Sequence, residues 1–278
     1  MKVRIISAAV GLVILGFVLA FFDTAILNTA VAAISALSVY ELLNAINKDR
    51  PKFPEFMCIL MAAAIPFSPM PIFKGFLPLF AYMLVLVEMC ILIKYHKTLT
   101  FEQFTADFFI SFAIPVTYTM FIYLRDKNTA FVGLCYVLIA LAAAWTTDTG
   151  AYFVGVKFGK HKLCPEISPK KTVEGAVGGI VFGLVCMLLI CFGMQKLSAV
   201  YFESPITVNY IYILIFAPIL SVISMVGDLS ASIIKRQHGI KDFGNIMPGH
   251  GGIVDRFDSV LMVLPAVYIF SNFFPIVK

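Results

Sequence analysis

The chain has 278 residues, of which 60% are apolar and 13% charged, and its formal net charge is +5. A soluble domain is nearer one-quarter charged, so this composition, with a mean hydropathy of +0.94, excludes a soluble globular protein. Apolar runs of about 17–25 residues recur from end to end, which is the length that crosses the roughly 30 Å of hydrocarbon in a bilayer. The runs are continuous rather than alternating, which excludes a membrane β-barrel. We therefore predict an all-α, polytopic integral membrane protein.

The apolar runs predict about nine transmembrane helices. They cover residues 5–22, 24–44, 55–72, 76–94, 107–124, 129–154, 173–194, 207–226 and 257–275. The third is interrupted near its end by Pro66, Pro69 and Pro71, which break helices. We find no linker or repeat in the sequence, so we expect one integral domain over 1–278, with N-terminal helices in 1–128 and the functional helices and loops in 129–278.

The lysine and arginine residues indicate the orientation of these spans. With the amino terminus in the cytoplasm, most of the 21 lysine and arginine residues fall in cytoplasmic segments, as the positive-inside rule requires. Both polar segments described next then face the cytoplasm.

The first polar segment follows the sixth span. Asp148 lies between an apolar run and a glycine-bearing segment, where an aspartate usually faces a bundle interior or a wet cavity. A helix cap is the alternative, because Asp favours cap positions. Residues 168–172 are predicted to form a turn leading into the next helix. Lys170 and Lys171 would make that helix start an anion site suited to phosphate, or they form an ordinary positive-inside flank.

The second polar segment, residues 225–259, concentrates ionisable groups among glycines. If the eighth helix continues into this segment, Asp228, Ser232 and Lys235 fall on one face at i, i+4 and i+7. Such a density of polar groups is costly in an apolar chain unless the groups line water, metal or ligand.

Two more aspartates, Asp255 and Asp258, are three residues apart at the start of the ninth span and would share a helix face. Together with Asp228 they would bring carboxylates from two helices toward one place. Carboxylates that meet repel one another unless a cation lies between them, and hard oxygen ligands select ions such as Mg²⁺. The sequence therefore predicts a magnesium site.

Basic side chains accompany these carboxylates, which suits phosphate ligands. They are Lys235, Arg236, Lys241, His250 and Arg256. The glycines of residues 248–252 would let backbone N–H groups approach an anion closely. The alternative is a network of salt bridges between cytoplasmic helix ends.

These motifs resemble the signature of the phosphatidate cytidylyltransferase family, also called CDP-diacylglycerol synthases, in its bacterial form. The resemblance is carried by Ser232-x-x-Lys235-Arg236, Lys241-Asp242, Pro248-Gly249-His250-Gly251-Gly252 and Asp255-Arg256-x-Asp258-Ser259. Upstream, Asp148-Thr-Gly-Ala-Tyr152 and Ser168-Pro-Lys-Lys-Thr-x-Glu174-Gly are similar to the family's second motif block. The motifs cover the last 130 residues or so, whereas the first half matches only as apolar helix.

The resemblance implies transfer of the cytidylyl group of CTP to phosphatidate, giving CDP-diacylglycerol and pyrophosphate in phospholipid biosynthesis. It also implies a requirement for Mg²⁺, a second cation such as K⁺, a location in the inner cell membrane with the site facing the cytoplasm, and a homodimer. No nucleic-acid partner is expected.

The resemblance also assigns roles to individual residues. The expected metal ligands are Asp148, Asp228, Asp255 and Asp258. The residues expected to act in catalysis are Asp228, Lys235, Arg236, His250, Asp255 and Asp258, and those expected to bind substrate are Lys170, Lys171, Ser232, Lys241 and Arg256.

Two other functions fit parts of the pattern. A CTP-dependent lipid kinase would also need CTP and metal, but it would release CDP rather than pyrophosphate. An ion-coupled secondary transporter would also carry intramembrane acids, although these acids lie at the ends of spans and the sequence shows no inverted repeat.

Overall fold

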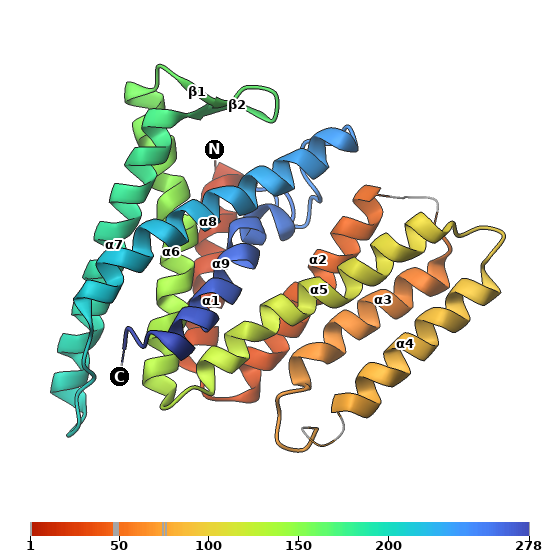
Figure 1. Ribbon diagram of the computed structural model, residues 1–278, viewed down its shortest axis with the longest axis horizontal. Helices are drawn as coiled ribbons and strands as arrows, with labels where there is room; N and C mark the ends of the chain where they lie inside the picture. Colours follow the sequence, from red (N-terminus) through yellow and green to blue (C-terminus); the bar gives the residue numbers. More distant parts are fainter. Residues whose placement is uncertain (1, 47–49, 74, 76, 278) are drawn as a thin grey trace. The chain divides into compact units, whose positions relative to one another are not determined.

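The computed structural model describes residues 2–46, 50–73, 75 and 77–277, which are mostly helical (Figure 1). The chain forms two compact units. The first unit comprises Met1–Ile122 and His238–Arg256, and the second comprises Tyr123–Gln237 and Phe257–Lys278. The expectation of one domain divided near residue 128 stays a prediction.

The first unit is built from helices that begin at the amino terminus. They are α1 (Lys2–Ala20), α2 (Ala25–Ile46), α3 (Lys52–Ala64), the short 3-10 helix η1 (Ile65–Phe67), α4 (Leu77–Lys94) and most of α5 (Phe101–Arg125). Helix α3 ends before Pro66, as the prolines predicted, because proline cannot continue the hydrogen-bond ladder. The predicted third span was therefore too long.

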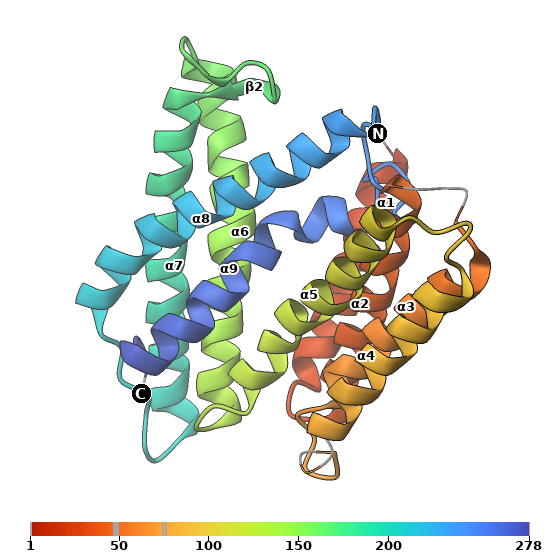
Figure 2. The same ribbon diagram turned by 45° about the vertical axis from the view of Figure 1, so that its right-hand side comes forward.

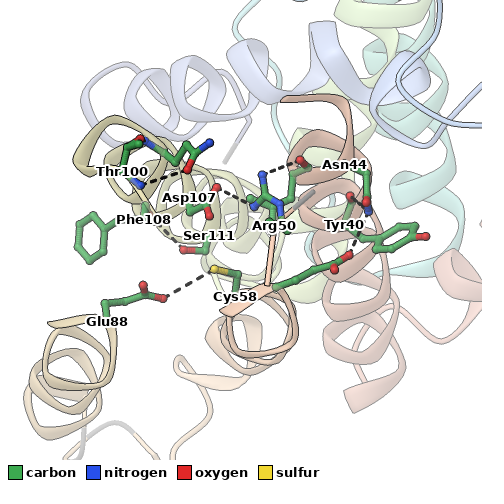
Figure 3. Close-up of polar contacts among 12 residues, drawn as sticks. Tyr40, Asn44, Arg50, Cys58, Glu88, Thr100, Asp107, Phe108 and Ser111 are labelled. Atoms are coloured by element: carbon green, nitrogen blue, oxygen red, sulfur yellow. Dashed lines mark hydrogen bonds and ion pairs between the residues drawn. The ribbon is translucent and has the colours of Figure 1, made fainter. Parts of the chain in front are cut away.

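Buried polar side chains connect the helices of the first unit (Figure 3). Arg50 Nη1 lies 2.7 Å from Asp107 Oδ1, and Arg50 Nη2 donates to the Leu43 carbonyl oxygen at 2.7 Å. Cys58 Sγ lies 3.8 Å from Glu88 Oε1. All the side chains of this network are buried, so the charges of Arg50 and Asp107 are paired as buried charges must be.

The second unit holds the remaining elements. They are α6 (Ala130–Phe158), β1 (Lys162–Cys164), β2 (Ser168–Thr172), α7 (Val173–Tyr201), α8 (Tyr210–Gln237) and most of α9 (Val254–Phe273). The strands form an antiparallel hairpin in which Lys162 pairs with Thr172 and Cys164 with Ser168. The predicted turn at residues 168–172 was therefore wrong, since that segment finds a strand partner a few residues upstream.

Helices α6 and α7 lie side by side in both views of the molecule (Figures 1 and 2). Their close approach depends on Gly175, Gly179 and Gly183, which recur at every fourth position of α7. A Cβ at Gly175 would lie 2.7 Å from the Ala151 carbonyl oxygen, and one at Gly179 would lie 2.7 Å from that of Thr147. Small residues thus let two helix backbones pack closely, as in membrane helix pairs.

Five described helices are long and apolar enough to cross a membrane. They are Ala25–Ile46, Phe101–Arg125, Ala130–Phe158, Val173–Tyr201 and Tyr210–Gln237. On α7 the exposed residues Val177, Val181, Val185 and Leu189 form an apolar stripe. Soluble proteins rarely expose so continuous an apolar face. The chain is therefore an integral membrane protein with a mostly helical fold.

Candidate active site

Three aspartates from different helices of the second unit form a carboxylate cluster, which we define as Asp148 of α6, Asp228 of α8 and Asp258 of α9. Asp228 and Asp258 lie close enough to Asp148 to influence its charge. Gly227 brings α8 and α9 together beside the cluster, because a Cβ there would lie 2.9 Å from the Asp258 carbonyl oxygen. The sequence predicted that Asp228, Asp255 and Asp258 converge; the structure relates Asp228 and Asp258 to Asp148, and the inclusion of Asp255 stays a prediction.

A lysine supplies positive charge to the carboxylate cluster. Nζ of Lys171, on β2, forms an ion pair with Oδ2 of Asp228, and each side chain is 25% exposed. The same ammonium group also acts electrostatically on Asp148. Clustered carboxylates need such a counter-charge, so the ion pair brings Lys171 to the cluster, and its role beyond that of a membrane flank stays a prediction.

Asp148 lies in the interior of α6 rather than at its end, so the helix-cap interpretation is wrong. Its Oδ2 accepts a hydrogen bond of 3.1 Å from the hydroxyl of Ser259. Ser259 is buried, and its backbone N–H also donates to Asp258 Oδ1 at 2.7 Å. One serine therefore connects two members of the cluster.

The start of α7 is occupied by groups of the protein itself. Thr172 Oγ1 accepts from the Gly175 N–H at 3.1 Å, which caps the helix. Glu174 accepts from the backbone N–H groups of Lys160 and His161 at 3.0 and 3.2 Å. Lys170 is exposed on the same hairpin. The expectation that Lys170 and Lys171 bind phosphate stays a prediction.

Helix α8 continues beyond Asp228 to Gln237, which confirms that Asp228, Ser232 and Lys235 lie on one helix at the expected spacing. Ser232 is buried, whereas Arg236 is exposed. Arg236 Nε donates to the Ile167 carbonyl oxygen at 3.4 Å, which joins α8 to the tip of the hairpin.

The first unit contains the middle part of the second polar segment, residues 239–253, which we call the glycine loop. Gly249 and Gly251 have φ angles of 77° and 85°, which favour glycine because a side chain is strained there. Arg256 donates to the His250 carbonyl oxygen through Nε at 2.9 Å and Nη2 at 2.6 Å. His250 Nδ1 is buried without a hydrogen-bond partner among the described residues.

Asp255 organises the glycine loop. Its Oδ2 accepts hydrogen bonds of 2.9 Å from the backbone N–H groups of Phe243 and Gly252. Lys241 is exposed in the same loop. The role of Asp255 as a metal ligand stays a prediction, and the structure adds a role in holding the loop.

Glu41 of α2 is an acid at the glycine loop that was not predicted from the sequence. Its Oε1 and Oε2 accept hydrogen bonds of 3.0 Å from the backbone N–H groups of Ile253 and Val254. Of the loop N–H groups predicted to bind an external anion, that of Gly252 instead donates to Asp255, so the prediction is wrong at this position. The sequence did carry one indication of a role for Glu41, because it is an acid within an apolar run.

Among the described residues, no group of three or more His, Cys, Asp and Glu side chains is arranged to hold a metal ion. The carboxylate cluster nevertheless offers hard oxygen donors, the type that Mg²⁺ prefers. In the structure the Lys171 ammonium stands beside Asp228, where a cation is needed. The donor chemistry thus fits Mg²⁺, and both Mg²⁺ and K⁺ stay predictions.

The fold and the site together define an integral membrane protein whose carboxylates and lysines suit anionic, phosphate-bearing ligands. The family model described as "Cytidylyltransferase family" matches residues 2–274. The chain is 35% identical over 275 residues to phosphatidate cytidylyltransferase of Bacillus subtilis (strain 168), covering 96% of each chain. It is 33% identical over 271 residues to that of Staphylococcus aureus (strain COL), covering 97% of this chain and 98% of the relative.

The chain belongs to the cytidylyltransferase family. The resemblance drawn from the motifs of the second half is thus confirmed, and the match also includes the apolar first half. Neither the lipid kinase nor the secondary transporter is supported by these comparisons.

Proposed function

We propose that the chain transfers the cytidylyl group of CTP to phosphatidate, giving CDP-diacylglycerol and pyrophosphate. The observation that carries this proposal is the carboxylate cluster of Asp148, Asp228 and Asp258 with Lys171 paired to it. The chain is an enzyme, a nucleotidyltransferase, and its relatives from Bacillus and Staphylococcus are named for this activity.

The reaction joins two anions, which defines what the protein must supply. A phosphate oxygen of phosphatidate forms a bond to the α-phosphorus of CTP, and the bond from that phosphorus to pyrophosphate breaks. The nucleophile is already ionised, so no strong general base is required. The barrier is mainly electrostatic, and cationic groups lower it by neutralising the reacting phosphates and the leaving group.

The chain's basic residues would perform that neutralisation. We assign the phosphates of CTP or of the lipid to Lys170, Lys171, Lys235 and Arg236, with Ser232 beside them on α8. We assign the leaving pyrophosphate to Lys241, His250 and Arg256 of the glycine-loop region. The buried, unpartnered Nδ1 of His250 supports this assignment, because such an atom is costly unless a ligand satisfies it.

Mg²⁺ would be held by Asp148, Asp228 and Asp258, with Asp255 as a further proposed ligand. When bound there, it would neutralise phosphate charge and stabilise the charge that develops on pyrophosphate. A second cation such as K⁺ is part of the same proposal. Ser259 would orient two of the ligands, because it bonds both Asp148 and Asp258.

For the location we propose about nine membrane-crossing segments, a site on the cytoplasmic side and residence in the inner cell membrane, with phosphatidate entering from the bilayer. The distribution of lysine and arginine supports this orientation. A homodimer is also proposed, from family resemblance.

The decisive experiment incubates purified protein with phosphatidate, Mg²⁺ and CTP labelled in the cytidine. We expect label in CDP-diacylglycerol and release of pyrophosphate. In a parallel reaction with diacylglycerol in place of phosphatidate, label in CDP together with a phosphorylated lipid would indicate the kinase instead. Substrate-dependent flux into vesicles without nucleotide turnover would indicate transport.

A further inference from the structure

Glu41 is a buried acid within an apolar, membrane-length helix. It lies in α2, and only 2% of its surface is exposed. An acid in such a place is costly unless its oxygens are bound. Both oxygens are bound, by the N–H groups of Ile253 and Val254, more than 200 residues away in the sequence. Val254 is the first residue of α9, and a carboxylate at a helix N-terminus is stabilising.

Two positions of the glycine loop, Gly244 and Gly252, have no room for a side chain because the Glu41 carboxylate lies against them. A Cβ on Gly252 would lie 2.6 Å from Cδ and from Oε1 of Glu41, and a Cβ on Gly244 would lie 2.7 Å from its Cδ. Neither glycine has a positive φ, so backbone strain does not explain them. They leave room for Glu41.

The other buried acids of the first unit have different partners. Asp107 pairs with Arg50, and Glu88 lies against Cys58 (Figure 3). Glu55 accepts from Asn44 and Lys52. Glu88 is as deeply buried as Glu41, at 1% exposed. It therefore serves as a matched control for a change at Glu41.

We propose that Glu41 is a positioning residue for cytidylyl transfer, which holds the end of the glycine loop and the first turn of α9 in the arrangement that the reaction requires. Through these bonds it fixes the backbone that carries His250, Asp255 and Arg256. The inference rests on the proposed function, since these are residues that we assign to metal or pyrophosphate.

The first test compares Glu41→Gln with Glu88→Gln in purified, detergent-solubilised protein. Glu41→Gln keeps one acceptor oxygen and turns the other into a donor that faces an N–H group. We expect faster hydrogen–deuterium exchange in peptides covering residues 245–256, and a KM for CTP raised by about tenfold, the effect of losing one ligand contact of roughly 1.4 kcal/mol. Loss of folded molecules alone would not change KM. Glu88→Gln should change neither quantity.

The second test adds a side chain at Gly252, where a Cβ would lie against Glu41. Gly252→Ala should lower activity, and the loss should be much smaller when Glu41 is already alanine, because contacting residues are non-additive. Gly16→Ala on α1 is the control, because a Cβ there has no neighbour within 4 Å.

Unchanged exchange and KM in Glu41→Gln, or additive effects of Gly252→Ala and Glu41→Ala, would overturn the role of Glu41. Absence of CDP-diacylglycerol from wild-type reactions would overturn the proposed function instead, while the exchange experiment would still report whether Glu41 holds the loop. The two failures are therefore distinguishable.

Discussion

The side chains of Lys171 and Asp228, each 25% exposed, form an ion pair between β2 and α8. Removal of one partner from such a partly buried pair leaves the other charge poorly compensated. Lys171 also acts electrostatically on Asp148, so the lysine balances the charge of two acids. The Lys171 ammonium group, which is already held beside the carboxylates, is suitably placed to bind an incoming phosphate.

We predict that Lys171→Ala lowers the rate of CDP-diacylglycerol formation by about 10²-fold, the usual effect of losing one electrostatic contact in a reaction that develops negative charge. Lys162→Ala is the matched control, because Lys162 lies on the paired strand, is exposed and has no assigned role. Steady-state turnover of the two variants checks the prediction. Wild-type rates in both variants would show that the lysines of the hairpin contribute only to membrane orientation.

Asp228→Asn tests the metal proposal at the same pair. The amide keeps the shape of the side chain but removes a charge that attracts a hard cation. We expect the Mg²⁺ concentration that gives half-maximal activity to rise and the maximal rate to fall, while the protein stays folded in detergent. Glu166→Gln, an exposed change in the hairpin turn, should leave the Mg²⁺ titration unaltered. A wild-type titration curve for Asp228→Asn contradicts the assignment.

At the level of helices, the position of Asp148 depends on how closely α6 approaches α7. Gly179 faces the Thr147 carbonyl oxygen, one residue before Asp148, and Gly183 faces the hydroxyl groups of Thr147 and Ser221. Thr147 Oγ1 also donates to Ser221 Oγ at 2.9 Å, which connects α6 to α8. Small residues of α7 therefore determine where two of the acid-bearing helices lie.

Gly179→Val should separate α6 from α7 and displace Asp148. We expect destabilisation of about 1–3 kcal/mol, the usual cost of overpacking, together with a lower turnover number in the molecules that remain folded. Gly193→Ala on the same helix is the control, since no atom lies within 4 Å of a Cβ there. Thermal unfolding and turnover per folded molecule check this prediction, and wild-type values for Gly179→Val would refute it.

Elements with a local signal were predictable from the sequence. The continuation of α8 past Asp228 follows from helical spacing, and the glycine loop follows from residues that no helix favours. The β1–β2 hairpin was missed because its short strands carry no alternating pattern. The contact of Glu41 with the glycine loop was not predicted, because its partners lie 212 and 213 residues away. Sequence periodicity describes only residues that are close in the chain.

Across the whole molecule, we predict the membrane orientation from charge and from helix length. Helix α7 has 29 residues, and an α-helix of that length extends about 43 Å, enough to cross the bilayer. Lys170 and Glu203 are exposed just beyond its two ends. The proposed orientation places Lys170 in the cytoplasm and Glu203 on the other side.

Single cysteines at these two positions, in a chain whose own cysteines are replaced, test that orientation. A membrane-impermeant maleimide should label Lys170→Cys only in inside-out vesicles and Glu203→Cys only in right-side-out vesicles. Labelling of both positions from one side would contradict a membrane-crossing α7. Reversal of the pattern would contradict a cytoplasmic hairpin.

The bond between Glu41 and the start of α9 has a consequence for the order of synthesis. Helix α2 leaves the ribosome before the two N–H groups that bind Glu41, which follow it by 212 and 213 residues. During elongation this acid must remain protonated or stay in contact with water, because hydrocarbon does not tolerate a bare carboxylate. The carboxylate can be bound only after Ile253 and Val254 have been synthesised, so the glycine loop takes its arrangement long after α2 has been made.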